Sequence, residues 1–250
     1  MEKVILELRN ITKTFPGIKA LDNVHFSLRK GEIHALMGEN GAGKSTLVKI
    51  ITGVHFPDSG EIYLRGEKVT FSNPMDTQRR GIAAIYQNAT CFPDLTVAEN
   101  IFIGHEKCTT PFNRIDWKKM HAEAQNLLDQ LGARISSREL MGILSVAQRQ
   151  IVEIAKALSM NAQILIMDEP TAGVDVLSRS AIAKMIKTLR QEGCTIVLTS
   201  HYIDELELLC DKIAILNQGQ LLYTGSVDAI LKTTQAESLE QLMLTLEDEE

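Results

Sequence analysis

The chain has little cysteine and no apolar run long enough to cross a membrane. Four of its 250 residues are cysteine, and no two form a C-x-x-C pair: Cys91, Cys108, Cys194 and Cys210. This usage favours a reduced, cytosolic protein over a disulfide framework or a zinc site. No apolar stretch approaches the ~20 residues of a membrane span, and Met1-Glu2-Lys3 does not begin a signal peptide. We therefore expect any membrane role to depend on a partner.

Positive charge is also scarce. The sequence has 26 lysine and arginine residues against 32 aspartate and glutamate residues, a net charge of −6, and it has no basic cluster. Nucleic acid is therefore not an expected partner. The remaining composition, 44% hydrophobic and 23% charged, is that of an ordinary globular protein with enough length for one large domain or two small lobes.

Glycine is more plentiful, and three of the 16 glycines belong to one patterned segment. The pattern G-x-x-x-x-G-K-[ST] is complete in Gly38-Glu39-Asn40-Gly41-Ala42-Gly43-Lys44-Ser45, and Thr46 follows. Residues 33–37 before it are apolar, as in a buried strand, and residues 45–51 after it are helix-compatible and stop before Gly53. Strand, glycine loop and helix is the arrangement that a phosphate-binding loop requires.

The chemistry of this loop suits a phosphorylated ligand. Glycines let backbone N–H groups turn towards a phosphate, a helix N-terminus adds positive potential, and Lys44 adds a full charge. Ser45 is placed to ligate magnesium. The alternative, a chance match in a glycine-rich turn, is disfavoured by the flanking patterns. The sequence predicts a site for a nucleoside triphosphate with Mg²⁺.

Strand and helix patterns alternate along the rest of the chain. Short apolar runs predict strands at 4–6, 24–28, 62–64, 81–86, 164–167 and 195–198, and a hairpin over 212–223. Helical periodicity dominates 88–160, most clearly from Asp116 to Gly132, and returns at about 176–192 and 239–246. The β-branched runs predict a parallel sheet covered on both faces. We expect an α/β core of 1–87 and 161–250 and a helical lobe of 88–160.

Polar residues follow three of these strands. Asp168 can hold magnesium through water, and Glu169 can orient an attacking water. The amide oxygen of Gln87 can bind magnesium or that water, and His201 can donate a hydrogen bond to the terminal phosphate. Taken singly, each is an ordinary strand cap or surface polar group. Their common position at the carboxyl ends of strands favours a binding site.

A further pattern lies at residues 144–148. Ser145 and Gln148 fit the S/T-x-x-E/Q capping box, and an apolar helical stripe continues after them. The free N–H groups at this helix start, which include those of Val146 and Ala147, form a second potential anion site. The plain alternative is an ordinary capped helix.

The order of these features resembles the nucleotide-binding domain of ABC transporters. The features occur in the family's order over nearly all 250 residues: Phe15, the phosphate loop, Gln87, Leu144-Ser145-Val146-Ala147-Gln148, Asp168-Glu169, Asp175 and His201. The resemblance implies an α/β fold, a RecA-like P-loop NTPase core with an N-terminal antiparallel β-subdomain and an inserted α-helical subdomain. It also implies ATP and Mg²⁺ as cofactors.

The resemblance assigns roles and partners. Phe15 is similar to the aromatic residue that stacks on adenine, a contact worth ~1–3 kcal/mol. Glu169, His201 and Gln87 are the implied catalytic residues, and Asp175 ends the family's D-loop. In the family, two domains meet head to tail, and each ATP lies between one phosphate loop and the other domain's signature helix. The implied partners are a second ATPase domain and transmembrane permease subunits, at the cytoplasmic face of the membrane.

The signature departs from the family's most common form. Val146 and Ala147 replace two glycines, which keeps the N–H groups but adds bulk. Carbohydrate importers of the family often carry such variants, and residues 13–17, 92–100 and 152–158 resemble those importers, which usually hold two ATPase domains in one chain. Residues 170–175 and 199–205 look more like ABC-2 export ATPases, so a mosaic of two subfamilies stays open.

Three other functions stay open. A soluble ABC ATPase that acts on ribosomes or DNA is disfavoured by the acidic net charge. A P-loop kinase needs an acceptor pocket and has no use for a signature helix. A module that binds ATP without turnover would result if the substituted signature, or a mosaic interface, prevented dimer closure.

Overall fold

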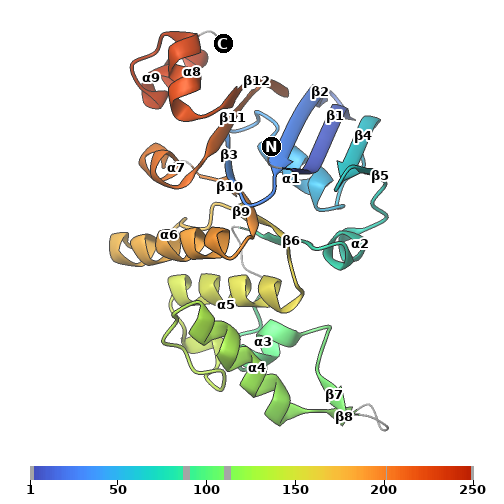
Figure 1. Ribbon diagram of the computed structural model, residues 1–250, viewed down its shortest axis with the longest axis vertical. Coiled ribbons are helices and arrows are strands. Elements are labelled where there is room, and N and C mark those ends of the chain that lie inside the picture. Colours follow the sequence, from blue (N-terminus) through green and yellow to red (C-terminus); the bar gives the residue numbers. More distant parts are fainter. Residues whose placement is uncertain (1–2, 87–90, 110–113, 201, 249–250) are drawn as a thin grey trace.

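The computed structural model describes residues 3–86, 91–109, 114–200 and 202–248. Figure 1 shows two sheets with their helices in the upper part of the molecule and a separate group of helices at the lower end. The arrangement confirms the predicted α/β class, with an antiparallel β-subdomain beside a parallel sheet. Within the described ranges, none of the helices has the length and apolar character needed to span a bilayer.

The antiparallel sheet has the strand order β2-β1-β4-β5. Its members are β1 (Val4–Phe15), β2 (Ile18–Arg29), β4 (Ser59–Leu64) and β5 (Glu67–Val69). The first two strands are longer than the predicted runs, and only Pro16-Gly17 separates them. Register shifts interrupt their pairing at several points, which breaks the strict alternation by which a strand is recognised in a sequence.

The larger sheet has the order β12-β11-β3-β10-β9-β6. It consists of β3 (Ile33–Met37), β6 (Ile82–Ile85), β9 (Ile164–Asp168), β10 (Thr195–Thr199), β11 (Lys212–Asn217) and β12 (Gln220–Gly225). All its neighbours pair in parallel except β11 with β12. Thr199 pairs with both Asp168 and Leu36, so β3, β9 and β10 end at one edge. This edge carries the predicted site.

Two apolar cores cover the faces of this sheet, as expected for a parallel sheet. One face packs against the β-subdomain and α1 (Lys44–Ile51). The other packs against α5 (Val146–Ser159), α6 (Val176–Gln191), α7 (Ile203–Leu209) and α9 (Leu239–Asp248). The predicted stripe of the last helix is confirmed, because Leu239, Leu242 and Leu246 are buried. The helices α2 (Pro74–Arg79) and α8 (Val227–Thr234) complete this part.

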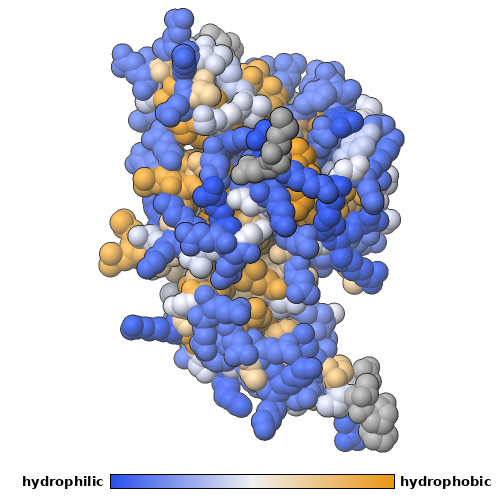
Figure 2. All heavy atoms as spheres, in the orientation of Figure 1, coloured by the Kyte–Doolittle hydropathy of each residue, from blue (hydrophilic) through white to orange (hydrophobic). Residues whose placement is uncertain are grey.

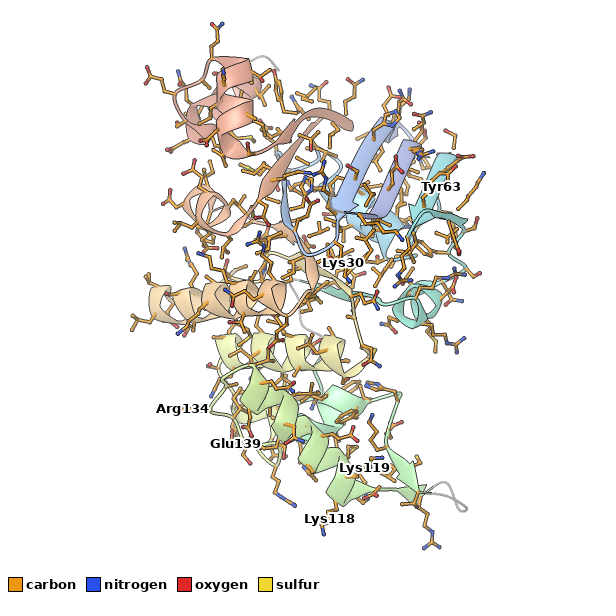
Figure 3. All side chains as sticks on the ribbon, in the orientation of Figure 1. Lys30, Tyr63, Lys118, Lys119, Arg134 and Glu139 are labelled. Carbon is orange, nitrogen blue, oxygen red and sulfur yellow. The ribbon has the colours of Figure 1, made fainter. Side chains whose placement is uncertain are left out.

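The lower helices surround a core of their own. It is formed by α3 (Val97–Phe102), α4 (Trp117–Gln130) and α5, with a short 3₁₀ turn (Met141–Ile143). A small exposed hairpin of β7 (Cys108–Thr109) and β8 (Arg114–Ile115) lies outside this core. Helix α4 begins at the predicted cap, where Asp116 accepts the Lys119 N–H at 3.0 Å. Its outer surface carries Lys118 and Lys119 (Figure 3). Trp117, at the start of the helical run predicted from Asp116 to Gly132, is 49% exposed and does not belong to this core.

Candidate functional site

The glycine loop connects β3 to α1 through backbone conformations that glycine favours. Gly38, Gly41 and Gly43 have φ angles of 144°, 93° and 106°. A Cβ atom at Gly43 would lie 2.5 Å from the Ala20 carbonyl oxygen on β2, and one at Gly38 would collide with the Leu216 carbonyl oxygen. The loop is therefore packed tightly between two strands, and larger residues at these two positions would displace it.

Lys44 lies at the start of α1 with its ammonium turned back over the loop. It donates hydrogen bonds to the carbonyl oxygens of Gly38 and, at 2.8 Å, Glu39. Burial lowers the pKa of Lys44, and the nearby carboxylates of Glu169, Asp168 and Glu39 act in the opposite direction. Gly43 caps the helix without a side-chain hydrogen bond, so no capping side chain competes for its first N–H groups. These groups form a concave, cationic surface suited to phosphate.

Asp168 and Glu169 are held at the same sheet edge by one residue of the neighbouring strand. The Thr199 hydroxyl donates to Asp168 Oδ1 at 2.6 Å and accepts the Glu169 N–H at 3.0 Å. The same N–H also donates to the Thr199 carbonyl oxygen at 3.1 Å. Glu169 has a φ of 50°, which is uncommon for a residue with a side chain, and these bonds stabilise it. Lys44 and this acidic pair thus belong to one site.

The predicted capping box starts α5. Ser145 Oγ accepts the Gln148 N–H at 3.3 Å, and Gln148 Oε1 accepts the Ser145 N–H at 2.9 Å. Val146 is 55% exposed, whereas Ala147 is buried. The principal contacts of α5 are with α3, α4, α6 and β6. Its N-terminus therefore presents N–H groups and an apolar side chain to solvent, apart from the elements that carry the phosphate loop.

Asp175 caps the next helix of the predicted site. Its carboxylate accepts the Ser178 N–H at 3.0 Å, and hydrogen bonding around Ser178 lowers its pKa. Val176 and Leu177 follow with 77% and 84% of their surface exposed. Figure 2 shows exposed apolar side chains at the left edge of the molecule, at the level of α6 and α7. A charged cap and an apolar surface thus lie together at the start of α6.

Phe15 ends β1 and is half-buried beside the tight turn to β2. It pairs with Ile18, two residues before Ala20, whose carbonyl oxygen approaches Gly43. The His55 ring lies 5.3 Å from the Phe15 ring at an interplanar angle of 65°. Phe15 therefore lies at the end of β1, next to the start of β2, which is the strand that borders the phosphate loop.

A cavity of about 350 Å³ lies beside the loop at the carboxyl end of the sheet. Among the described residues, its lining comes from the end of β3, the loop, the residue after β10, α7 and α9: Met37, Gly38, Glu39, Asn40, Ser200, Ile203 and Met243. Gln87 and His201, both predicted for the site, lie outside the described residues. Ser45 is exposed at the first turn of α1, and Thr46 follows it half-buried.

A family model described as ABC transporter matches residues 21–172, more than half of the chain. The chain belongs to the ABC transporter family. The matched region of this ABC chain contains the phosphate loop, the start of α5 and the Asp168–Glu169 pair. The family match therefore includes the residues described above for the candidate site.

Named relatives of the ABC chain are import proteins. It is 46% identical over 242 residues to a putative ribose/galactose/methyl galactoside import ATP-binding protein of Agrobacterium fabrum, with 95% of the chain and 48% of the relative covered. It is 44% identical over 232 residues to a xylose import ATP-binding protein of Geobacillus kaustophilus, with 92% and 46% covered. The chain spans about half the length of these relatives.

Solved structures of ATP-binding cassettes share the fold. A nucleotide-free cassette of an ABC transporter matches with a TM-score of 0.84 at 28% identity and covers 96% of this chain and 97% of its own. A dimeric cassette in a post-hydrolysis state, bound to ADP and phosphate, matches with a TM-score of 0.75 at 27% identity, with 89% and 98% covered. These matches confirm the predicted P-loop NTPase fold.

Thr199 was not among the sequence candidates. A signal for it was present in the sequence, because it directly follows the predicted strand run at 195–198 and precedes Ser200 and His201. Its role became evident only through the pairing of β10 with β9, which places its hydroxyl opposite Asp168.

Proposed function

We propose that this chain binds and hydrolyses ATP as the ATPase subunit of an ABC importer for carbohydrate. The observation that carries the proposal is the single site in which Lys44 on the phosphate loop lies near Asp168 and Glu169, with both acidic residues fixed by Thr199. In this site Lys44 and the loop N–H groups bind the phosphates, and the Glu169 carboxylate accepts a proton from the attacking water. The names of the relatives support the sugar-import assignment.

The donor set also fits Mg²⁺. The ion prefers oxygen ligands and binds through one or two carboxylates together with substrate phosphates. Ser45, Asp168 and Gln87 would hold it, and Asp168 is already oriented by the Thr199 hydroxyl. When bound, the ion neutralises charge on the phosphates. We further propose that His201 contacts the terminal phosphate.

Two kinds of partner complete the proposal. The exposed α5 N-terminus, with Ser145 to Gln148, and the exposed surface after Asp175 are suited to a second ATPase domain, which would place each ATP between two chains. Dimeric cassettes among the similar structures support this arrangement. Transmembrane permease subunits would hold the chain at the cytoplasmic face of the membrane and carry the sugar.

A second candidate is an ABC module that binds ATP without turnover. The exposed Val146 side chain favours it, because this bulk lies where a second chain's phosphate would approach. Phosphate release, measured at several protein concentrations, with and without an added phosphoryl acceptor, separates the possibilities. We expect release that needs no acceptor and rises more than linearly with protein concentration. Release that required an acceptor would indicate a kinase, and nucleotide binding without release would indicate the inert module.

A further inference from the structure

Two side chains contact the Phe15 ring, and a third, Asp58, holds one of them. The Lys13 ammonium lies 5.5 Å from the Phe15 ring centroid, within the range of a cation–π contact. The His55 ring meets the Phe15 ring nearly edge-on, with 5.3 Å between centroids. Asp58 forms an ion pair with Lys13 at 2.7 Å. The orientation of the Phe15 ring therefore depends on residues that lie about 40 positions further along the chain.

Asp58 also fixes the backbone next to Phe15. Its second carboxylate oxygen accepts the Thr14 N–H at 2.6 Å, and its own N–H donates to the Thr12 carbonyl oxygen at 2.8 Å. The Lys13 ammonium, followed by the Thr14 N–H, lowers the pKa of Asp58, which keeps the carboxylate charged. One residue thus holds the end of β1 through a side-chain ion pair and two backbone hydrogen bonds.

The same segment is attached to the helix of the phosphate loop. The His55 N–H donates to the Lys49 carbonyl oxygen at 3.0 Å, in the last turn of α1. The neighbouring Val54 N–H donates to that oxygen at 2.8 Å. Residues 54–58 therefore link the C-terminal end of α1 to the strand end that carries Phe15.

We propose that His55 and Asp58 are positioning residues for nucleobase binding, which set the Phe15 ring at a fixed distance from the phosphate loop. The inference rests on the proposed function, in which Phe15 stacks on adenine. Stacking requires a parallel approach of two rings at a defined separation, and a ring free to rotate about its χ angles would lose entropy on binding. A ring that is already held binds the base without that loss.

The test separates affinity for the base from affinity for the phosphates. Dissociation constants are measured for ATP and for inorganic tripolyphosphate, which has the phosphates without the base. Phe15→Ala is expected to weaken ATP binding about 5- to 150-fold, the range for loss of one base-stacking contact. Asp58→Asn and His55→Ala are each expected to weaken ATP binding about 3- to 10-fold and to leave tripolyphosphate binding and kcat within twofold. His55→Phe restores ATP affinity.

A double-mutant cycle and a matched control complete the design. In the Phe15→Ala background, Asp58→Asn and His55→Ala are expected to have no further effect on ATP binding. The control is Glu7→Gln, which breaks another ion pair of β1, Arg9 with Glu7 at 2.8 Å, over Tyr63 on the outer sheet surface (Figure 3). It is expected to change neither ligand's affinity.

The outcomes distinguish the stacking role of Phe15 from the positioning roles of His55 and Asp58. If Phe15→Ala left the ratio of ATP to tripolyphosphate affinity unchanged, the stacking role of Phe15 and the positioning roles would both be wrong. If Phe15→Ala lowered that ratio but Asp58→Asn and His55→Ala did not, only the positioning inference would be overturned. Equal losses for ATP and tripolyphosphate would assign His55 and Asp58 to general stability of the fold, which also overturns it.

Discussion

Glu169 occupies an unusual backbone conformation at the carboxyl end of a buried strand, and its N–H makes two hydrogen bonds to Thr199. Uncommon φ values persist where surrounding contacts enforce them, and they are frequent at catalytic positions. The side chain of Glu169 therefore leaves the strand in a direction that an ordinary extended residue would not adopt. This geometry supports the proposal that Glu169, rather than Asp168, acts on water.

Replacement of Glu169 by glutamine tests this assignment. The amide keeps the size of the side chain but cannot accept a proton, so we expect turnover to fall by ~10²–10⁴. MgATP binding should persist, because Lys44 and the loop N–H groups remain. Steady-state phosphate release and nucleotide binding by fluorescence measure the two effects. Lys44→Ala is the complementary variant, which should weaken binding. Hydrolysis by Glu169→Gln at the parent rate would show that another group is the base.

Thr199→Val removes one hydroxyl and keeps the side-chain shape. Asp168 loses its 2.6 Å hydrogen bond, and a hydrogen bond to a charged group contributes ~1.5–3 kcal/mol. We expect kcat to fall about tenfold or more, with a smaller change in ATP affinity. Thr199→Ser retains the hydroxyl and should recover most of the rate. A rate for Thr199→Val equal to that of the parent would mean that the hydroxyl does not orient the acidic pair.

The residues at the start of α5 have both a structural role, as a helix cap, and a proposed role in contacting a second chain. The capping box alone explains why a helix begins at Val146, and an N-cap contributes ~1 kcal/mol. The capping box does not explain why Val146 is exposed. Its side chain is apolar and forms no hydrogen bonds that burial would break. In the proposed dimer, the N–H groups at this helix N-terminus would contact the phosphate bound by a second chain. The exposed Val146 side chain would contact the apolar surface around that phosphate.

Substitutions at this helix start separate bulk from capping. Val146→Gly with Ala147→Gly keeps both N–H donors and removes side-chain volume, but adds backbone freedom that costs ~0.5–1 kcal/mol per residue. We expect turnover to change by less than about tenfold. Ser145→Arg removes the cap and adds a large side chain, and it should abolish ATP-driven dimerisation and most hydrolysis. Both variants are compared by sedimentation and phosphate release. Unchanged behaviour of Ser145→Arg would leave α5 as an ordinary capped helix.

A second property of α5 concerns stability. Burial raises the pKa of Glu153 above its ordinary 4.5, and Lys156 opposes this only in part. The folded state therefore binds more protons than the unfolded state, and stability falls as pH rises from the unfolded pKa through the folded one. Glu153→Gln should raise Tm at neutral pH by about 1–3 °C, since ~1 kcal/mol shifts Tm by about 2–4 °C in a chain of this size.

The control for this prediction is the exposed Glu67 on β5. Glu67→Gln should leave Tm unchanged, and the advantage of Glu153→Gln should disappear below pH 4.5. Thermal unfolding of the three proteins between pH 4 and pH 8 measures both effects. A Tm gain that did not depend on pH would assign the effect of Glu153→Gln to packing rather than to charge.

Several elements with local signals were predicted, whereas the side-chain contacts between distant residues were not. The caps at Asp116 and Ser145 lie three residues from the groups that they bind, so adjacent sequence specifies them. The hairpin of β7 and β8 has two residues in each strand, which is too short for periodicity to show. The link between Lys13 and Asp58 joins residues 45 positions apart, and only the folded β-subdomain brings them together.

At the scale of the whole molecule, the chain carries two groups of candidate site residues on different elements. Lys44 belongs to the phosphate loop and lies near Asp168 and Glu169, whereas Ser145 caps α5, in the helical part of the molecule (Figure 1). A two-fold dimer in which each copy contributes one group to the other's site closes on itself and uses every one of these residues twice. The acidic net charge of −6 opposes association without a ligand, so dimerisation should depend on nucleotide.

Sedimentation velocity of Glu169→Gln with and without MgATP tests this account most directly. The variant retains the binding residues but hydrolyses slowly, so the nucleotide-bound form accumulates. We predict a monomer without nucleotide and a dimer with MgATP, with the dimer lost again when Ser145→Arg is added. A monomer at high protein and MgATP concentrations would contradict the claim that two copies of this chain enclose ATP between them.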